Sequence, residues 1–204
     1  MHGTEASPSS RFEADVIRLS IALIPIIAMT WAPAEPPVAE RWRAWPASEV
    51  FPARLPGTTP SGARTAYVLA GIAPEAPCAR AFHPGALLRG CLTALRATYV
   101  DTTQTFVATA GVAVLTGAPP PPAERGDPRP ATVTPYTVPG GPAELFGTRQ
   151  YITGARIGSG PRYVVMTAAG YTDGRPYTKG QGAPPRLRGM ARELATALHR
   201  RLTG

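Results

Sequence analysis

Cys78, His83 and Cys91 are the residues whose types and spacing offer the most chemistry in this sequence. Together they could supply three metal ligands, and Cys78 with His83 could form a nucleophile and its base. A structural zinc site needs four ligands, however, and no fourth is evident nearby. In an exported chain the two cysteines are expected to form a disulfide, whose loop closure contributes about 3 kcal/mol in the chain-entropy model. In a cytoplasmic chain two buried thiols would be expected instead.

The serines and carboxylates form no recognisable hydrolytic motif. Ser159 stands in GARIGSGPR, which lacks the GxSxG pattern and precedes a strand rather than a helix. Asp101 and Asp173 are expected in turns. A two-carboxylate site remains open, because such partners meet in space rather than in sequence. The sequence therefore indicates no catalytic residue, no metal ligand and no cofactor.

The chain carries a formal net charge of +8, and Lys179 is its single lysine, so the positive charge is almost entirely arginine. Such a balance favours anionic partners. The arginines are spread along the sequence, which is typical of a solvated basic surface, and a dedicated anion-binding face is the alternative. Aromatic and basic residues do not interleave as they do in an RNA-binding sheet, so no nucleic-acid partner is expected.

An apolar segment near the N-terminus indicates a membrane-directed chain. It carries no charge from residue 19 to residue 34, and its apolar side chains are Leu19, Ile21, Leu23, Ile24, Ile26, Ile27, Met29 and Trp31. Three interpretations stay open: an uncleaved single-pass anchor, a signal sequence cleaved after Ala34, or an ordinary buried helix. Pro25 disfavours the buried helix. We expect residues 1–34 to direct the chain to the membrane, with the C-terminal domain outside the cell membrane or secreted.

Two windows, residues 35–63 and 117–142, are rich in proline, which prevents long helices. We expect residues 35–63 to form an extended stalk, with Trp42 and Trp45 holding it against the domain. Residues 117–142 are expected to form a loop within a domain that spans residues 64–204.

The remaining pattern predicts a small α+β domain. Thr65–Ile72 is predicted as a buried strand, Leu92–Asp101 and Gln104–Leu115 as one hairpin, and a second hairpin flanks the turn GSGP. Apolar residues at three- and four-residue steps predict an amphipathic helix, with His199 near its end as a surface cation; they are Leu187, Met190, Leu194, Leu198 and Leu202. The expected fold is an antiparallel sheet of two hairpins plus a further strand, with short helices and this C-terminal helix on one face.

Four stretches between Arg41 and Arg175 resemble a group of uncharacterised secreted or membrane-anchored proteins of high-GC actinobacteria. They are RWRAWPASEVFPARLP, GIAPEAPCARAF, CLTALRATYVDTTQTFVATAGVAVL and AAGYTDGRP. The resemblance implies export and an α+β body with two paired cysteines. It supplies no activity and no catalytic residues. The proline-rich window after Gly117 departs from the group, in which more helix would be expected.

These observations together favour a non-enzymatic cell-envelope protein, membrane-anchored or secreted, with a binding or accessory role. Its expected partners are the membrane, through the N-terminal segment, and an envelope protein or anionic polymer. One alternative is an exported hydrolase with an unrecognised active site. A second alternative is a binder of anionic polymer or lipid that uses an arginine-rich surface.

Overall fold

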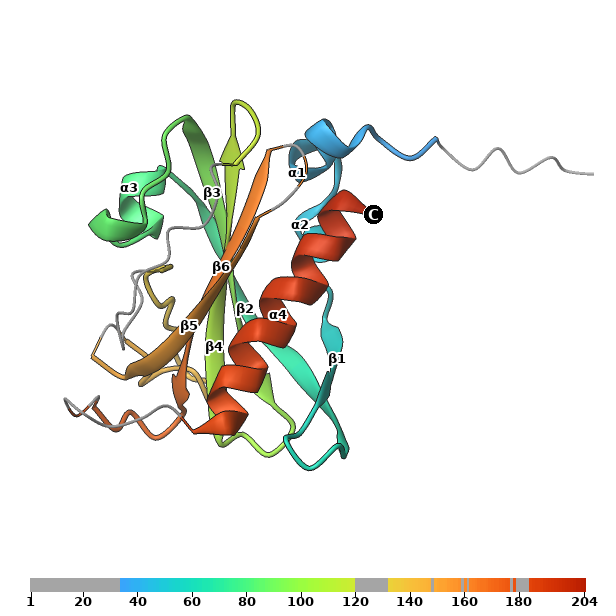
Figure 1. Cartoon of the computed structure of the whole chain (residues 1–204). Coiled ribbons are helices and arrows are strands. Elements are labelled where there is room, and N and C mark those ends of the chain that lie inside the picture. The colour runs from blue at the N-terminus through green and yellow to red at the C-terminus, as the bar shows by residue number, and fades with distance from the viewer. Residues whose placement is uncertain are drawn as a thin grey trace, which may run out of the picture. The chain divides into compact units, whose positions relative to one another are not determined.

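The sheet within Glu35–Gly204 has six antiparallel strands in the spatial order β1-β2-β3-β4-β6-β5 (Figure 1). The computed structural model describes residues 34–119, 132–147, 149–158, 160, 162–176, 178 and 184–204. The strands are β1 (Arg54–Thr58), β2 (Arg64–Ala76), β3 (Cys91–Asp101), β4 (Phe106–Leu115), β5 (Tyr151–Gly158) and β6 (Tyr163–Tyr171). The predicted α+β fold with an antiparallel sheet is confirmed.

Alternation along β3 and β4 divides the sheet into two apolar faces. Leu95, Ala97 and Tyr99 belong to the same core as Ala108, Ala110 and Val112. Residues at the alternate positions of β3, such as Ala94 and Val100, belong to the core on the opposite face. Because successive side chains of a strand point to opposite faces, a strand with apolar residues at nearly every position must be covered on both sides.

One face is covered by the C-terminal helix α4 (Pro185–Thr203). The predicted apolar stripe is buried, together with Ala191 and Ala195. The small side chain of Ala191 lets the helix approach the sheet, and Thr167 of β6 donates a 2.9 Å hydrogen bond to the Ala191 carbonyl. The sheet curls around this helix, so α4 packs on β5 and β6 and also reaches β1 at the opposite edge (Figure 1).

The other face is covered by α3 (Cys78–Ala81), by η2 (Pro84–Ala86) and by the chain from residue 132 to residue 146. Gly111 of β4 makes this packing possible. A Cβ at this position would lie 2.6 Å from Val133 Cγ2 and 2.9 Å from Phe82 Cε1.

The structure places residues 35–63 differently from the extended stalk expected of them. They contain η1 (Val38–Glu40), α1 (Arg41–Ala44), α2 (Ala47–Val50) and β1, and residues Glu35–Gly204 form one compact unit. Prolines separate these short elements, but the apolar residues between the prolines are buried: Val50, Phe51 and Leu55 belong to the core beneath α4. The domain boundary expected at residue 64 therefore lies near residue 35.

Several contacts tie this N-terminal part to the rest of the domain, and two of them involve buried side chains. The Tyr163 hydroxyl donates to the Val38 carbonyl at 2.7 Å. The buried Arg41 donates to the Leu202 carbonyl at 3.1 Å, and so satisfies a free carbonyl at the end of α4. Trp42 and Trp45 pack against the core, as expected.

The predicted membrane segment, from Leu19 to Trp31, lies outside the described residues. Among the residues that are described, no helix has both the length and the apolar character needed to cross a membrane.

Candidate functional site

The two cysteines form a disulfide that joins the start of α3 to the start of β3. Cys78 and Cys91 have a Cα–Cα distance of 6.2 Å and a sequence separation of 13. The bond removes the free thiolate that a Cys78–His83 nucleophile or a zinc site would require. His83 lies beside Tyr151, with 5.6 Å between ring centroids. Within the described ranges, no three His, Cys, Asp or Glu residues lie close enough together to hold a metal ion.

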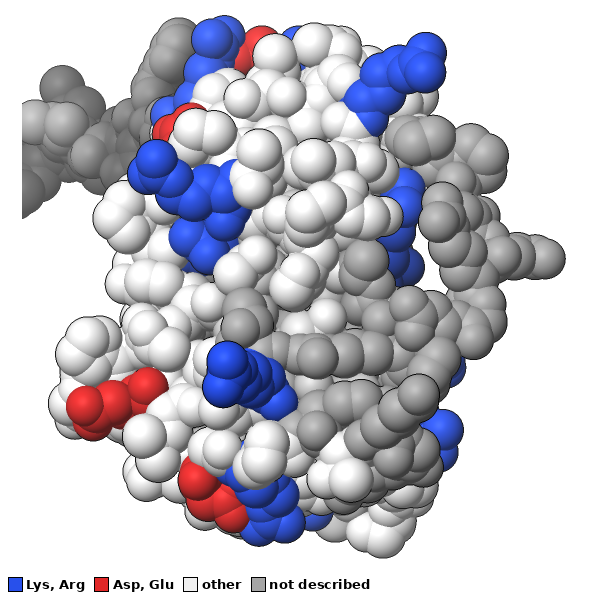
Figure 2. Space-filling model, turned by 90° about the vertical axis from the view of Figure 1, so that its left-hand side faces the viewer, with Lys and Arg blue, Asp and Glu red and all other residues white. Residues whose placement is uncertain are grey.

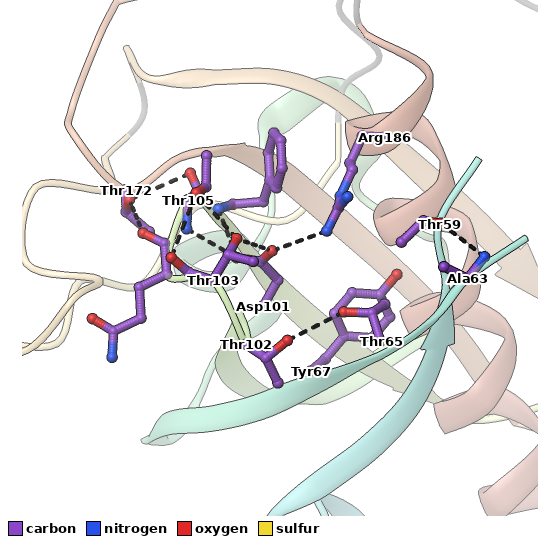
Figure 3. Close-up of polar contacts among 12 residues, drawn as sticks. Thr59, Ala63, Thr65, Tyr67, Asp101, Thr102, Thr103, Thr105, Thr172 and Arg186 are labelled. Atoms are coloured by element: carbon purple, nitrogen blue, oxygen red, sulfur yellow. Dashed lines mark hydrogen bonds and ion pairs between the residues drawn. The ribbon is translucent and has the colours of Figure 1, made fainter. Parts of the chain in front are cut away.

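A cluster of polar contacts lies where the β3–β4 turn meets the N-terminal part of α4 (Figure 3). Its centre is the carboxylate of Asp101, the last residue of β3, which is almost completely buried. The carboxylate accepts the backbone N–H groups of Thr105 at 2.9 Å and Phe106 at 3.0 Å. It also accepts the Thr103 hydroxyl at 2.5 Å. Asp101 therefore holds the turn that allows β4 to follow β3.

Arg186 connects this turn to the helix. Its Nη2 lies 3.4 Å from Asp101 Oδ2, and its guanidinium stacks over the ring of Phe106, 5.1 Å from the centroid. Figure 3 shows the side chain reaching from the first turn of α4 toward Asp101. The pair supplies a positive charge to a buried carboxylate, which would otherwise be costly to desolvate.

Glu193, two helical turns further on, joins α4 to the opposite edge of the sheet. Its Oε2 accepts the Tyr67 hydroxyl at 2.6 Å and the backbone N–H of Thr58 at 3.0 Å. Burial, and then the hydrogen bond to Glu193, raise the pKa of Tyr67 well above its ordinary value. Tyr67 is therefore a hydrogen-bond donor here and not a base.

The space within this cluster is too small for a substrate. Tyr67, Asp101 and Arg186 line a cavity of about 10 Å³, with Thr58, Thr65, Phe106 and Met190. A cavity needs about 10–15 Å³ of accessible volume to hold a single water molecule. Both carboxylates therefore have a structural role. Asp101 stabilises the β3–β4 turn, and Glu193 stabilises the packing of α4 against the sheet.

The sequence also drew attention to Asp173, Ser159 and His199. Asp173 is on an exposed turn, where the hydrogen bond from Arg175 lowers the pKa of its carboxyl group. Ser159 falls outside the described residues. His199, expected as a surface cation, is instead only 5% exposed. The helix places it on a flank covered by other parts of the chain, which its position in the last turns did not indicate.

On the face that Figure 2 shows, basic side chains are dispersed rather than gathered in one patch. Arginine residues line two open hollows in the surface. One, of about 540 Å³, includes Arg54 and Arg64 of β1 and β2. The other, of about 350 Å³, lies between β5 and α4 and includes Arg156, Arg188 and Arg192.

Sequence reasoning did not identify the second hollow. Arg188 and Arg192 are four residues apart on a predicted amphipathic helix, which places them on one flank. That signal was present in the sequence, but the strand that this flank faces could be known only from the fold.

No protein-family model, curated protein or solved structure matches the chain. Its function is therefore inferred from its residues and their geometry.

Proposed function

We propose that this chain is a non-enzymatic cell-envelope protein, anchored in the membrane or secreted, whose domain has a binding or accessory role outside the cytoplasm. The observation that carries the proposal is the Cys78–Cys91 disulfide. Disulfides persist in oxidising compartments and are rare in the cytosol, so this bond favours export. Residues 1–34 would supply the anchor or signal, as their apolar sequence suggests.

A binding role is supported by the structural hydrogen bonds that ionisable groups of the domain make. Asp101 and Glu193 accept hydrogen bonds from the backbone and from neighbouring side chains, and Tyr67 donates to Glu193. These groups hold elements together around a space with no room for a substrate. Two open hollows, of about 540 Å³ and 350 Å³, are lined in part by arginines, which suit recognition of an anionic partner. A third hollow, of about 320 Å³, has Glu144 and Asp173 in its lining instead.

The proposal is tested by the location of the domain and by its lack of turnover. In intact host cells, a membrane-impermeant protease should digest a C-terminally tagged chain while leaving a cytoplasmic control protein whole. The purified protein should show no turnover in a broad hydrolase panel. Protection from the protease in intact cells, together with digestion after lysis, would contradict export. Turnover that is lost on a single substitution would favour the hydrolase alternative.

A further inference from the structure

The two flanks of α4 differ in how they meet the sheet. On the flank that faces β1, Glu193 accepts a backbone N–H from Thr58, and Arg186 is paired with Asp101. On the flank that faces β5, an open groove of about 350 Å³ remains. Its helix wall is made by Arg188, Arg192 and Thr196, and its other wall by residues 153–157 of β5. No carboxylate is among these lining residues.

β5 is an edge strand. Among the described residues it pairs with β6 alone. An edge strand presents backbone N–H and C=O groups that another strand can use. The opposite edge strand, β1, is shorter and contains Pro56, a residue that protects edges because it has no N–H to donate. The eight residues of β5 contain no proline.

The groove and the strand have matching lengths. Arg188 and Thr196 are eight residues apart on α4, which corresponds to about 12 Å of helix. Residues 153–157 of β5 extend over about 13 Å. The groove therefore follows the strand edge along the five residues 153–157, which suits an extended chain.

Arginines flank this edge on both faces of the sheet. Arg188 and Arg192 lie on the face covered by α4. Arg156 pairs with Met166, whose side chain belongs to the opposite core, so the side chain of Arg156 starts on the other face. No ion pair found between described residues involves any of these three arginines. Partial burial lowers the pKa of Arg156.

We propose that the edge of β5 and the adjoining α4 groove bind an acidic protein segment, which adds to the sheet as an extended strand. Main-chain hydrogen bonds to β5 would supply affinity. Acidic side chains of the added strand would alternate between its faces, and would meet Arg188 and Arg192 on one side and Arg156 on the other. An acidic protein segment is thus the class of partner that we infer for the binding role proposed above. The inference rests on that role.

The test uses the full-length chain and a fluorescein-labelled acidic peptide of about six residues, with glutamate on both faces of its extended form. Fluorescence anisotropy measures its affinity at about 0.1 M salt, where distant surface charges are screened. Replacing both Arg188 and Arg192 with Gln should weaken binding about tenfold or more, and Arg156→Gln about threefold. A peptide N-methylated at alternate amides, which cannot pair as a strand, should bind about tenfold more weakly.

The matched control removes the same charge elsewhere. Arg54→Gln with Arg64→Gln should change the affinity less than about twofold, because these arginines border the hollow at the β1 edge. Circular dichroism checks that each variant is folded. Backbone amide NMR shifts on peptide addition should be largest within β5.

Several results would overturn the proposal. An equal loss of affinity in the control variant would mean general charge attraction. Equal binding of the N-methylated peptide would mean anion binding without strand addition. Arginine-dependent binding of anionic lipid vesicles or inorganic polyphosphate that the peptide does not compete with would mean a different ligand class. No peptide binding would also overturn it, and would leave the export test of the proposed function unaffected.

Discussion

At the scale of single residues, the domain uses buried polar groups to connect segments that are distant in sequence. Asp101 links the β3–β4 turn to Arg186, 85 residues away, and Tyr67 donates to Glu193, 126 residues away. Each contact satisfies groups that would be costly to bury alone. These side chains are therefore expected to matter for stability, and their effects can be measured without a known ligand.

The Asp101 carboxylate gives the first prediction. Asp101→Asn keeps an oxygen for the two backbone N–H groups of the turn, but it removes the negative charge opposite Arg186 and puts an amide nitrogen in place of the oxygen that accepts the Thr103 hydroxyl. It should therefore lower the free energy of unfolding by about 2–3 kcal/mol. Urea denaturation measures the change. Asp173→Asn is the matched control, since that carboxylate is exposed, and it should shift the urea midpoint very little. Equal midpoints for both variants would show that Asp101 does not hold the turn.

Tyr67 gives a prediction for alkaline pH. Its pKa is raised in the folded protein, whereas in the unfolded chain a tyrosine titrates near pH 10. Above that pH the unfolded state loses a proton that the folded state keeps, so the stability present below pH 10 is progressively lost as the pH rises. Tyr67→Phe should make this loss smaller between about pH 9 and 11. An unchanged slope would mean that Tyr67 titrates normally in the folded protein.

At the scale of the elements, small residues decide how closely the two layers approach the sheet. Gly111 faces Val133 and Phe82, whereas a Cβ at Gly189 in α4 would have no atom within 4 Å besides those of its chain neighbours and of its own helix backbone. The same change at these two positions should therefore have opposite effects.

Gly111→Ala should destabilise the domain by about 1–3 kcal/mol, because the new methyl group would overlap the packed side chains. Gly189→Ala should stabilise it by about 1 kcal/mol, because alanine is a better helix former. Thermal unfolding of the two variants beside the unaltered chain measures both. Stabilisation by Gly111→Ala would mean that the layer formed by residues 132–146 packs less closely than described.

Elements defined by local periodicity could be predicted from the sequence. The β3–β4 hairpin could be predicted from two apolar runs joined by a short polar turn, and α4 from apolar residues at helical spacing. β1 could not be predicted in the same way, since its five residues include Pro56 and Gly57 and become a strand by pairing with β2. The Tyr67–Glu193 contact and the groove beside β5 depend on the curl of the whole sheet, which no local pattern encodes.

At the scale of the whole molecule, residues 35–58 complete the domain rather than only connecting it to the N-terminal segment. Phe51 is 1% exposed and lies in the core that includes Leu198 and Leu202 of α4. Phe51→Ala should lower the free energy of unfolding by about 3–5 kcal/mol.

Leu92→Ala is the matched control for Phe51, since Leu92 is a large apolar residue that is 51% exposed. It should cost less than about 1 kcal/mol. Similar urea midpoints for the two variants would indicate that the chain before residue 59 is a dispensable stalk after all.

The central claim is that the domain is exported and carries a disulfide between Cys78 and Cys91. It is tested most directly by the intact mass, under non-reducing conditions and with free thiols trapped at lysis, of the protein recovered from its native host. A mass that lacks two hydrogens and carries no trapping label is the predicted result, with or without residues 1–34. Full-length protein with both thiols labelled would place the domain in a reducing compartment and contradict the claim.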